Sequence, residues 1–183
     1  MNIIYIVNRI YSKLKLYRYL ILDKRVLITK DCDITGLKLR ISKDNGIVKF
    51  GRNFGCRDGV IFNVTSGELL IGDDVSINDR CIINVHKRIV IGQNTMIGQN
   101  VLMYDHDHDY TDLDHIRTSF LENEIVIGKN VWIGSNVVIL RGTHIGDNCV
   151  IGAGTVLKKD IPNNMIVYNN SVLTMKVRGG PLK

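Results

Sequence analysis

The chain has 183 residues, of which 45% are hydrophobic, and its formal net charge is +6. This length supports one modest hydrophobic core and does not require a second domain. The charge is moderate and accompanies no nucleic-acid-binding motif, so we expect no nucleic-acid partner. The four cysteines are scattered without a close pair, at Cys32, Cys56, Cys81 and Cys149. This spacing argues against a disulfide framework and a zinc ribbon, and it favours a reducing, cytoplasmic location.

Residues 1–23 form a basic and amphipathic N-terminal segment. They are rich in Ile, Leu and Tyr, but Arg9, Lys13, Lys15 and Arg18 interrupt them. No apolar run approaches the ~20 residues that a membrane-spanning helix needs, and no small-residue cleavage site marks a signal peptide. We expect a short helix with two open alternatives. It either docks on the end of the main domain or on a neighbouring subunit, or it rests as a peripheral element on the anionic inner face of a membrane.

From residue 24 onward, large apolar residues recur at a spacing of six, at first irregularly. The anchors are Phe50, Cys56 and Phe62, then Ile71, Ile77 and Ile83, then Ile91, Ile97 and Met103. The gap of eight between Ile83 and Ile91 indicates a two-residue insertion around residues 85–88, and solenoids accommodate such insertions as corner loops.

Between Met103 and Ile127 the apolar anchors fail, although the separation of 24 residues still equals four units of six. Residues 104–124, which open with the run DHDHD at 105–109, therefore predict a polar loop extruded from the repeat. Function concentrates on such loops of regular scaffolds.

The stretch 127–157 is the most regular part of the chain. Its anchors are Ile127, Ile133, Ile139, Ile145, Ile151 and Leu157. Neither a helix period of 3.6 nor a strand period of 2 produces this pattern, whereas a hexapeptide solenoid does. Each unit then forms one face of a triangular coil of eighteen residues, with its anchor pointing inward.

The other positions of the repeat fit the same prism. Gly recurs at the second position, small or β-branched residues at the fifth, and Asn at the fourth, where its tolerance of the left-handed conformation suits a corner. We therefore predict an all-β protein: a β-helix domain at residues 24–168, preceded by the N-terminal segment and followed by a tail at 169–183.

The run IGKNVWIGSNVVILRGTHIGDNCVIGAGTVLKKDIP, with the histidine-bearing loop before it, resembles the hexapeptide-repeat acyltransferases of the maltose and galactoside O-acetyltransferase type, including polysaccharide O-acetyltransferases. The similarity covers about residues 68–166. It implies a left-handed parallel β-helix, which departs from the usual right-handed crossover. It also implies a homotrimer with active sites between neighbouring subunits, and transfer of an acetyl group from acetyl-CoA to a sugar hydroxyl.

The reaction needs a base, since an alcohol is a poor nucleophile at neutral pH, and histidine is the natural candidate. A gapless alignment with the family places the catalytic histidine at His108, with His106 as the alternative. Asp105, Asp107 or Asp109 is expected to orient the imidazole, and the sequence does not choose among them.

The resemblance also implies substrate-binding residues. Asn78 matches an acceptor-binding asparagine, although Asn also serves as a corner residue. His86 replaces the acceptor-binding aspartate of the galactoside enzymes, and we group it and His106 with acceptor binding. The residues implied for the coenzyme A donor are Trp132, Ser135, Gly152, Ala153, Lys158 and Lys159.

We expect an acetyl-CoA-dependent O-acetyltransferase that acts on a cell-surface polysaccharide or its precursor and binds no metal. Three alternatives stay open. They are an amino-sugar N-acetyltransferase, a zinc carbonic-anhydrase-like hydratase that uses histidines such as His86, His106, His108 and His144, and a binding solenoid without catalysis.

Overall fold

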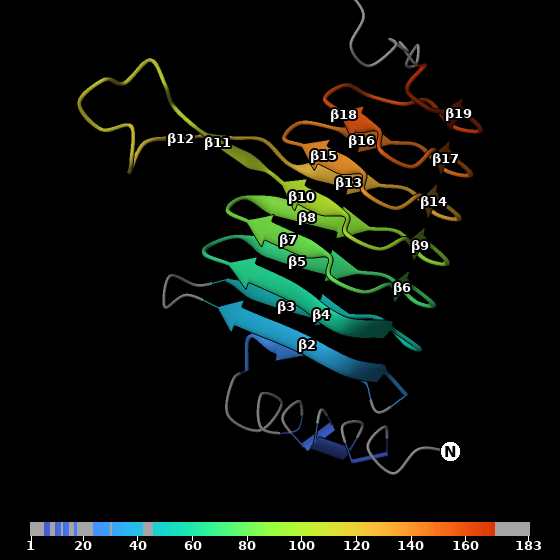
Figure 1. Cartoon of the computed structure of the whole chain (residues 1–183). Helices are drawn as coiled ribbons and strands as arrows, with labels where there is room; N and C mark the ends of the chain where they lie inside the picture. Colours follow the sequence, from blue (N-terminus) through green and yellow to red (C-terminus); the bar gives the residue numbers. More distant parts are fainter. Residues whose placement is uncertain are drawn as a thin grey trace, which may run out of the picture.

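The computed structural model describes residues 6, 7, 10, 11, 13, 14, 17, 24–29, 31–41 and 46–170 of the chain. From residue 26 on, these residues form a parallel β-solenoid, whose short strands stack as triangular coils along one axis (Figure 1). The predicted all-β, hexapeptide-repeat prism is confirmed. The arrangement is consistent with the left-handed β-helix that the resemblance implies.

Three faces make up the prism. The first contains β1 (Val26–Leu27), β3 (Ile47–Phe50), β5 (Glu68–Ile71), β8 (Arg88–Ile91), β13 (Ile125–Ile127) and β16 (His144–Ile145). The second contains β4 (Gly55–Val64), β7 (Ile82–Val85), β10 (Leu102–Tyr104), β15 (Val138–Leu140) and β18 (Val156–Leu157). The third contains β6 (Ser76–Ile77), β9 (Met96–Ile97), β14 (Trp132–Ile133), β17 (Val150–Ile151) and β19 (Ile166–Val167).

Two long strands near the N-terminal end bend around a corner. β2 (Asp33–Ile41) runs parallel to β4, and β4 pairs with β6 through its first residues and with β7 through its last. Gly59 lies at the bend with φ of +72°, a conformation that glycine adopts at little cost. These irregular coils explain why the sequence repeat is weak before residue 70.

The core is a column of the predicted anchors. Ile133 on β14 pairs with Ile97 below and Ile151 above, and Ile139 on β15 pairs with Met103 and Leu157. Each of these six side chains is at least 97% buried. Burying a side chain of this size contributes about 1.5–3 kcal/mol, so the stack of anchors stabilises the prism along its length.

Asparagine builds one of the corners, as the sequence predicts. Asn94, Asn130, Asn148 and Asn164 all have φ between 55° and 62°. The amide nitrogens of Asn94, Asn130 and Asn148 each donate to the amide oxygen one coil above, over 2.9–3.0 Å. The corner is therefore held by a ladder of side-chain hydrogen bonds that repeats with the coil.

The described residues of the N-terminal segment are helical. Their large apolar side chains are exposed: Ile6, Val7, Ile10, Tyr11, Leu14 and Tyr17. Among the described residues, no helix is long and apolar enough to cross a membrane. The rest of this segment, and the tail from residue 171 on, lie outside the described residues.

Candidate active site

The turns between strands stack into columns along the prism edges, and two columns hold most of the predicted site residues. The column that we call the glycine corner contains the turns after β6, β9, β14 and β17, at residues 78–80, 98–100, 134–136 and 152–154. The column that we call the hairpin corner contains the segments after β7, β10, β15 and β18, at residues 86–87, 105–124, 141–143 and 158–160. The second face of the prism separates the two corners.

The hairpin corner carries the extruded loop that the sequence predicts (Figure 1). The loop begins and ends as an antiparallel pair, β11 (His106–His108) and β12 (Phe120–Glu122), which the sequence did not predict. Met103 pairs with Ile139, 36 residues later, where a regular coil would take 18. The hairpin thus adds the length of one coil, and this explains why the six-residue register survives it.

His108 is exposed on this hairpin, and a hydrogen bond selects the tautomer of its neutral ring. Its Nδ1 lies 2.7 Å from the carbonyl oxygen of Ile116. A carbonyl only accepts, so Nδ1 carries the proton and Nε2 of the neutral ring holds a free lone pair. The ring also packs on Phe120, with 4.7 Å between centroids. This orientation is what a general base requires.

His106 has different surroundings. Its Nδ1 lies 3.1 Å from a carboxylate oxygen of Asp105, and only 15% of its side chain is exposed. Its ring stacks on that of His86, with 3.5 Å between centroids and 12° between planes. The sequence offered three aspartates as orienting groups. In the structure, Asp105 is the one that contacts an imidazole, and that imidazole is His106. His108 is oriented by a backbone carbonyl instead.

His86 completes the cluster at the base of the hairpin. Its Nδ1 lies 3.4 Å from Glu122, and the edge of its ring meets Phe120. Burial lowers the pKa of His86, and the neighbouring His106 lowers it further, against the opposing charges of Asp105 and Glu122. His86 is therefore a mostly buried, neutral-favouring imidazole. Its predicted contact with the acceptor stays a prediction.

The glycine corner brings together Ser135, Gly152 and Ala153, three of the residues that we expect to bind the coenzyme A donor. The turns stack so closely that a Cβ on Gly134 would lie 2.7 Å from the backbone nitrogen of Ala153. The Ser135 hydroxyl donates to Gln99 one coil below, over 2.8 Å. The result is a narrow edge of backbone and small side chains, the kind of surface along which a slender ligand can lie.

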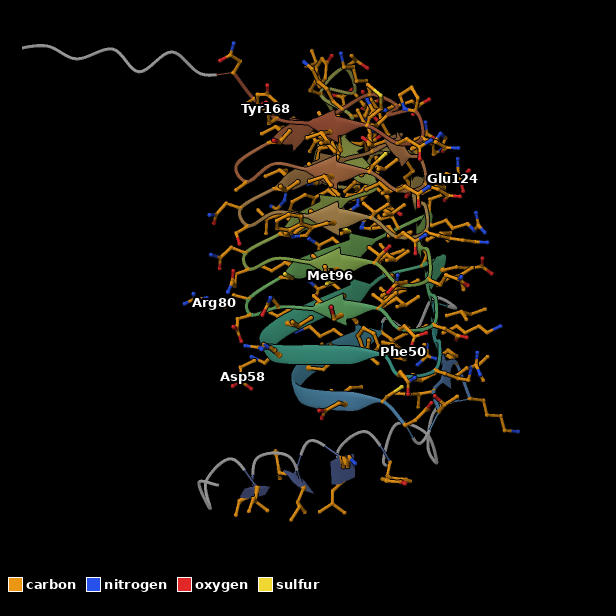
Figure 2. All side chains as sticks on the ribbon, turned by 90° about the vertical axis from the view of Figure 1, so that its right-hand side faces the viewer. Phe50, Asp58, Arg80, Met96, Glu124 and Tyr168 are labelled. Atoms are coloured by element: carbon orange, nitrogen blue, oxygen red, sulfur yellow. The ribbon has the colours of Figure 1, made fainter. Side chains whose placement is uncertain are left out.

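An apolar strip runs along the third face, next to this corner, and Figure 2 labels one of its residues, Met96. Met96, Trp132, Val150 and Ile166 occupy the same register on four successive strands. Met96 and Trp132 are each 54% exposed, and Ile166 is 71% exposed. Trp132 therefore points outward. An apolar strip with three of its four side chains exposed favours a ligand or another protein surface over it.

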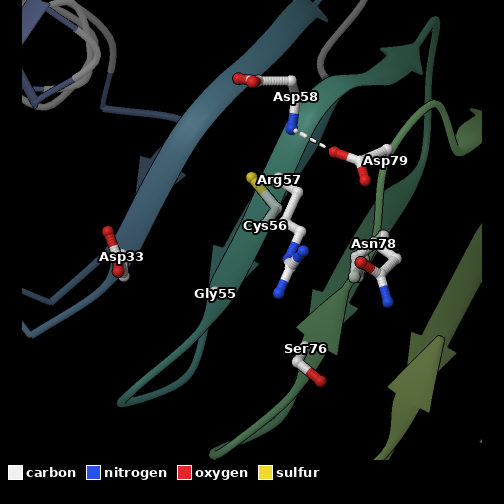
Figure 3. A pocket seen from close by; sticks show the side chains of 9 residues that line it. Asp33, Gly55, Cys56, Arg57, Asp58, Ser76, Asn78 and Asp79 are labelled. Atoms are coloured by element: carbon white, nitrogen blue, oxygen red, sulfur yellow. Dashed lines mark hydrogen bonds between the residues drawn. The ribbon is translucent and has the colours of Figure 1, made fainter. Parts of the chain in front are cut away.

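Asn78 lies below the strip in a polar hollow of about 520 Å³ (Figure 3). The hollow is lined by Asp33, Gly55, Cys56, Arg57, Asp58, Ser76, Ile77, Asn78 and Asp79. The side-chain oxygen of Asn78 is buried and has no hydrogen-bond partner among the described residues. A buried acceptor without a partner is costly, so this site suits a ligand that donates, such as a sugar hydroxyl.

The predicted residues therefore fall into two groups that one chain does not bring together. His86, His106, His108, Lys158 and Lys159 belong to the hairpin corner. Asn78, Trp132, Ser135, Gly152 and Ala153 belong to the glycine corner and the face beside it. Both lysines are exposed, and neither forms an ion pair within the part of the chain that the structure describes.

The histidines do not form a metal-binding arrangement in the described ranges. No group of three or more His, Cys, Asp or Glu residues is placed to hold a metal ion there. His86 and His106 stack face to face, so their nitrogen atoms do not converge on one point. No observation of the described chain favours a zinc hydratase.

Comparisons with known proteins identify the repeat. The family profile described as "Bacterial transferase hexapeptide (six repeats)" matches residues 124–159. A protein of Escherichia coli named as a lipopolysaccharide biosynthesis O-acetyl transferase is 29% identical over 160 residues, which are 80% of this chain and 81% of that protein. The galactoside O-acetyltransferase of Escherichia coli is 37% identical over 116 residues, which are 63% of this chain but only 57% of that enzyme.

Solved structures of acyltransferases are also similar to this chain. A hexapeptide-repeat acetyltransferase of Vibrio cholerae, in complex with acetyl-CoA, is 26% identical with a TM-score of 0.52, over 72% of this chain and 66% of that chain. An N-acyltransferase of Bacillus cereus, in complex with an amino-sugar nucleotide and coenzyme A, has a TM-score of 0.64 over 93% of this chain and 90% of that chain. At 18% identity the second likeness shows the fold alone.

Several parts of the site had no sequence signal that we recognised. Phe120 lies in a stretch without anchors, and its contacts with three imidazoles depend on the β11–β12 pairing. Arg141, which pairs with Asp107 over 2.6 Å, looks like an ordinary corner residue. The alternation of His and Asp in DHDHD is a strand pattern of period two, and it could have indicated β11.

Proposed function

Because the chain belongs to the hexapeptide-repeat acyltransferases, we propose that it transfers an acetyl group from acetyl-CoA to a hydroxyl of a sugar, with His108 as the general base. The observation that carries this proposal is the hydrogen bond from His108 Nδ1 to the carbonyl of Ile116. It leaves Nε2, on an exposed ring, ready to accept a proton. The similarity to proteins named O-acetyltransferases supports the reaction, and the similarity to an acetyltransferase in complex with acetyl-CoA supports the donor.

The proposed step is a direct acyl transfer. His108 Nε2 removes the proton of the acceptor hydroxyl as its oxygen attacks the thioester carbonyl carbon. The new C–O bond forms and the C–S bond breaks, and the proton held by His108 passes to the departing thiolate sulfur. The carbonyl of Ile116 stabilises the transient imidazolium by accepting from Nδ1 throughout.

We propose that the active site lies between copies of the chain in a homotrimer. One copy supplies its hairpin corner with His108, and the neighbour supplies its glycine corner with the strip around Trp132 and the hollow around Asn78. The separation of these two groups within one chain supports this arrangement, as does the exposed apolar strip.

Subunit complementation tests the shared site. His108→Ala and Asn78→Ala should each lower activity, and a mixed preparation of the two chains should regain about a quarter of the wild-type sites, because one interface in four then combines intact partners. Activity of the mixture equal to the mean of the two variants would contradict a shared site, and light scattering of the wild type checks the trimer directly.

The acceptor that we propose is a cell-surface polysaccharide or its precursor, acetylated in the cytoplasm at the inner face of the membrane. Two observations support it: the similarity to a protein named for lipopolysaccharide biosynthesis, and the exposed apolar side chains of the basic N-terminal segment. Pure acceptor fragments with blocked or free amino groups distinguish O- from N-acetylation, since only an N-acetyltransferase would require a free amine.

Vesicle sedimentation tests the membrane contact. The protein should sediment with anionic phosphatidylglycerol vesicles more than with neutral phosphatidylcholine vesicles. Ile10→Ser combined with Leu14→Ser should abolish this difference. Leu113→Ser, at an exposed apolar residue of the hairpin loop, is the matched control and should leave sedimentation unchanged. If the wild type, the double variant and Leu113→Ser all sediment equally with anionic vesicles, the proposed membrane contact is contradicted.

A further inference from the structure

The hairpin is tied to the prism by a buried carboxylate. Among the described residues, the buried polar side chains are three threonines and Asp105, whose side chain is 0% exposed. Its two oxygens accept from the backbone N–H groups of His86, Lys87 and Arg88, over 2.8–2.9 Å, and face the imidazole of His106. A charge at this depth persists only because these donors surround it.

Two of those N–H groups, of His86 and Lys87, belong to the two-residue turn between β7 and β8, and the third belongs to Arg88, the first residue of β8. In the coil below, the equivalent donor meets the backbone of the next coil, since the N–H of Thr65 donates to the carbonyl of Val85. Above the insertion the chain leaves as the hairpin, so that the next coil's backbone is missing there. The side chain of Asp105 takes its place and satisfies all three donors.

The same residue holds both ends of the hairpin. Its backbone carbonyl accepts from the N–H of Asn123, which follows β12, over 2.9 Å. On the other side of the hairpin, Asp107 pairs with Arg141 of the coil above. Because side chains alternate along a strand, Asp107 points away from the side that His106 and His108 share. The hairpin is thus fixed to the coil below by Asp105 and to the coil above by Asp107.

The electrostatics agree with a permanently ionised Asp105. Burial by itself raises the pKa of this carboxyl, but the hydrogen bonds from His106 and from the three backbone N–H groups outweigh it and hold the pKa below its ordinary value. The carboxylate therefore keeps all of its acceptor capacity at neutral pH.

We infer that Asp105 is a positioning residue for the acyl transfer: by joining the insertion turn to the root of the β11–β12 hairpin, it fixes the place of the His108 imidazole relative to the neighbouring subunit. This inference rests on the proposed role of His108. Asp105 itself touches His106 and the backbone, and it acts on the reaction through the hairpin.

The test is Asp105→Asn, which keeps the size of the side chain but turns an NH₂ group toward backbone N–H donors. We expect kcat to fall about 10–100-fold, since small misplacements of a catalytic group have effects of this order. The KM for acetyl-CoA should stay within about twofold, because Ser135, Gly152 and Ala153 lie at the other corner and the carboxylate of Asp105 bonds to residues 86–88 and His106 rather than to Lys158 or Lys159. The pH of half-maximal activity should not move, and hydrogen exchange should accelerate at residues 86–88 and 106–108.

Two controls separate positioning from general loss of stability. Asp73→Asn removes an exposed carboxylate that likewise accepts a backbone N–H, from Arg52 over 2.8 Å, but lies away from the hairpin. Val48→Ala weakens the fully buried core of the first face. Both should lower the melting temperature while leaving kcat unchanged at an assay temperature well below it.

Each outcome decides the inference. Unchanged exchange at residues 86–88, or a kcat equal to that of Asp73→Asn, would overturn it. A shift of the activity profile toward lower pH would also overturn it, since Asp105 would then act on the base directly through His106.

Should the asparagine variant not fold, Asp107→Asn loosens the hairpin from its other side and should show the same kcat-only loss, only smaller. His108→Ala, measured in the same series, tests the proposed function separately: its full activity would refute that function whatever Asp105→Asn shows.

Discussion

The regular coils at residues 127–157 and the hairpin corner use opposite means to reach a fixed structure. In the coils, one apolar anchor every six residues packs on its copies above and below, and one amide ladder repeats along a corner. In the hairpin corner, a buried carboxylate, a pair of stacked imidazoles and the exposed imidazole of His108 each occur once. The repeat supplies a rigid frame, and the base that we propose lies where the repeat is interrupted.

This difference predicts how each region responds to change. Each coil is stabilised mainly by its two neighbours, as in other repeat proteins, so a truncated anchor should lower stability in proportion to the apolar surface removed from the core. A polar cluster such as the one around Asp105 has no such redundancy, because each member satisfies another. Substitutions in the hairpin corner should therefore affect turnover more than melting temperature, and substitutions in the coils should do the reverse.

The largest effect is expected at His108. His108→Ala should lower kcat by about 10²–10⁴ with little change in the affinity for coenzyme A, because the imidazole acts on the acceptor hydroxyl. Steady-state kinetics with a sugar acceptor measure both quantities. His115→Ala is the matched control. This histidine lies in the same loop, its side chain is 71% exposed and pairs with Asp112, so its loss should leave kcat unchanged.

A metal-dependent mechanism gives a different pattern. It requires equal losses for His106→Ala and His108→Ala, inactivation by chelators, and about one metal ion per chain in the purified protein. Kinetics of the two variants together with elemental analysis distinguish the base from the metal ligand.

The next largest effect is expected in the core of the coils. Ile133→Ala should lower the free energy of unfolding by about 2–5 kcal/mol, because it leaves a cavity between Ile97 and Ile151. Ile166→Ala, on the same face but 71% exposed, should change it by less than about 0.5 kcal/mol. Urea titration measures both. Equal losses would mean that the anchors do not carry the stability of the frame.

The frame could be predicted from the sequence because its signal is repeated. Six anchors in succession, with glycine and asparagine at constant places, specify the face, the corner and the inward side of every unit between Ile127 and Leu157. Near the N-terminal end, the long strands β2 and β4 replace this pattern with pairings that no periodicity reveals.

The hairpin corner could be predicted only in part, because its contacts are not periodic. The sequence predicted an extruded loop at residues 104–124. The resemblance placed the base at His108, which stays a prediction. The sequence offered three aspartates without choosing among them, because it does not show which carboxylate meets the backbone N–H groups of residues 86–88. That contact joins two segments across a coil, and local spacing does not encode it.

A smaller effect is expected at the asparagine ladder. Asn130 has φ of 55° and bonds to Asn94 below and Asn148 above. Asn130→Ala should lose the ladder bonds and also strain the left-handed backbone, for a total of about 1–3 kcal/mol. Asn130→Gly relieves the strain and should cost about 1 kcal/mol less. Melting curves of the two variants side by side test this order, and a glycine variant less stable than the alanine variant would contradict it.

The smallest effect is expected in the pH dependence of stability, and it returns to the hairpin corner. The pKa of His86 is lowered by burial and by His106, whereas the unfolded chain has an ordinary imidazole with a pKa of about 6.5. As the pH falls through this value, the unfolded state binds a proton that the folded state resists, so the free energy of unfolding decreases. Asp105 adds a separate loss only at much lower pH, because its pKa lies below the ordinary carboxyl value.

His86→Phe keeps a ring to stack on His106 and to meet Phe120, but it cannot bind a proton. Urea titrations between pH 8 and pH 5 should therefore show a shallower decline for His86→Phe than for the wild type. An identical slope would mean that the stacked imidazoles do not oppose protonation, and that the hairpin corner is as indifferent to pH as the coils.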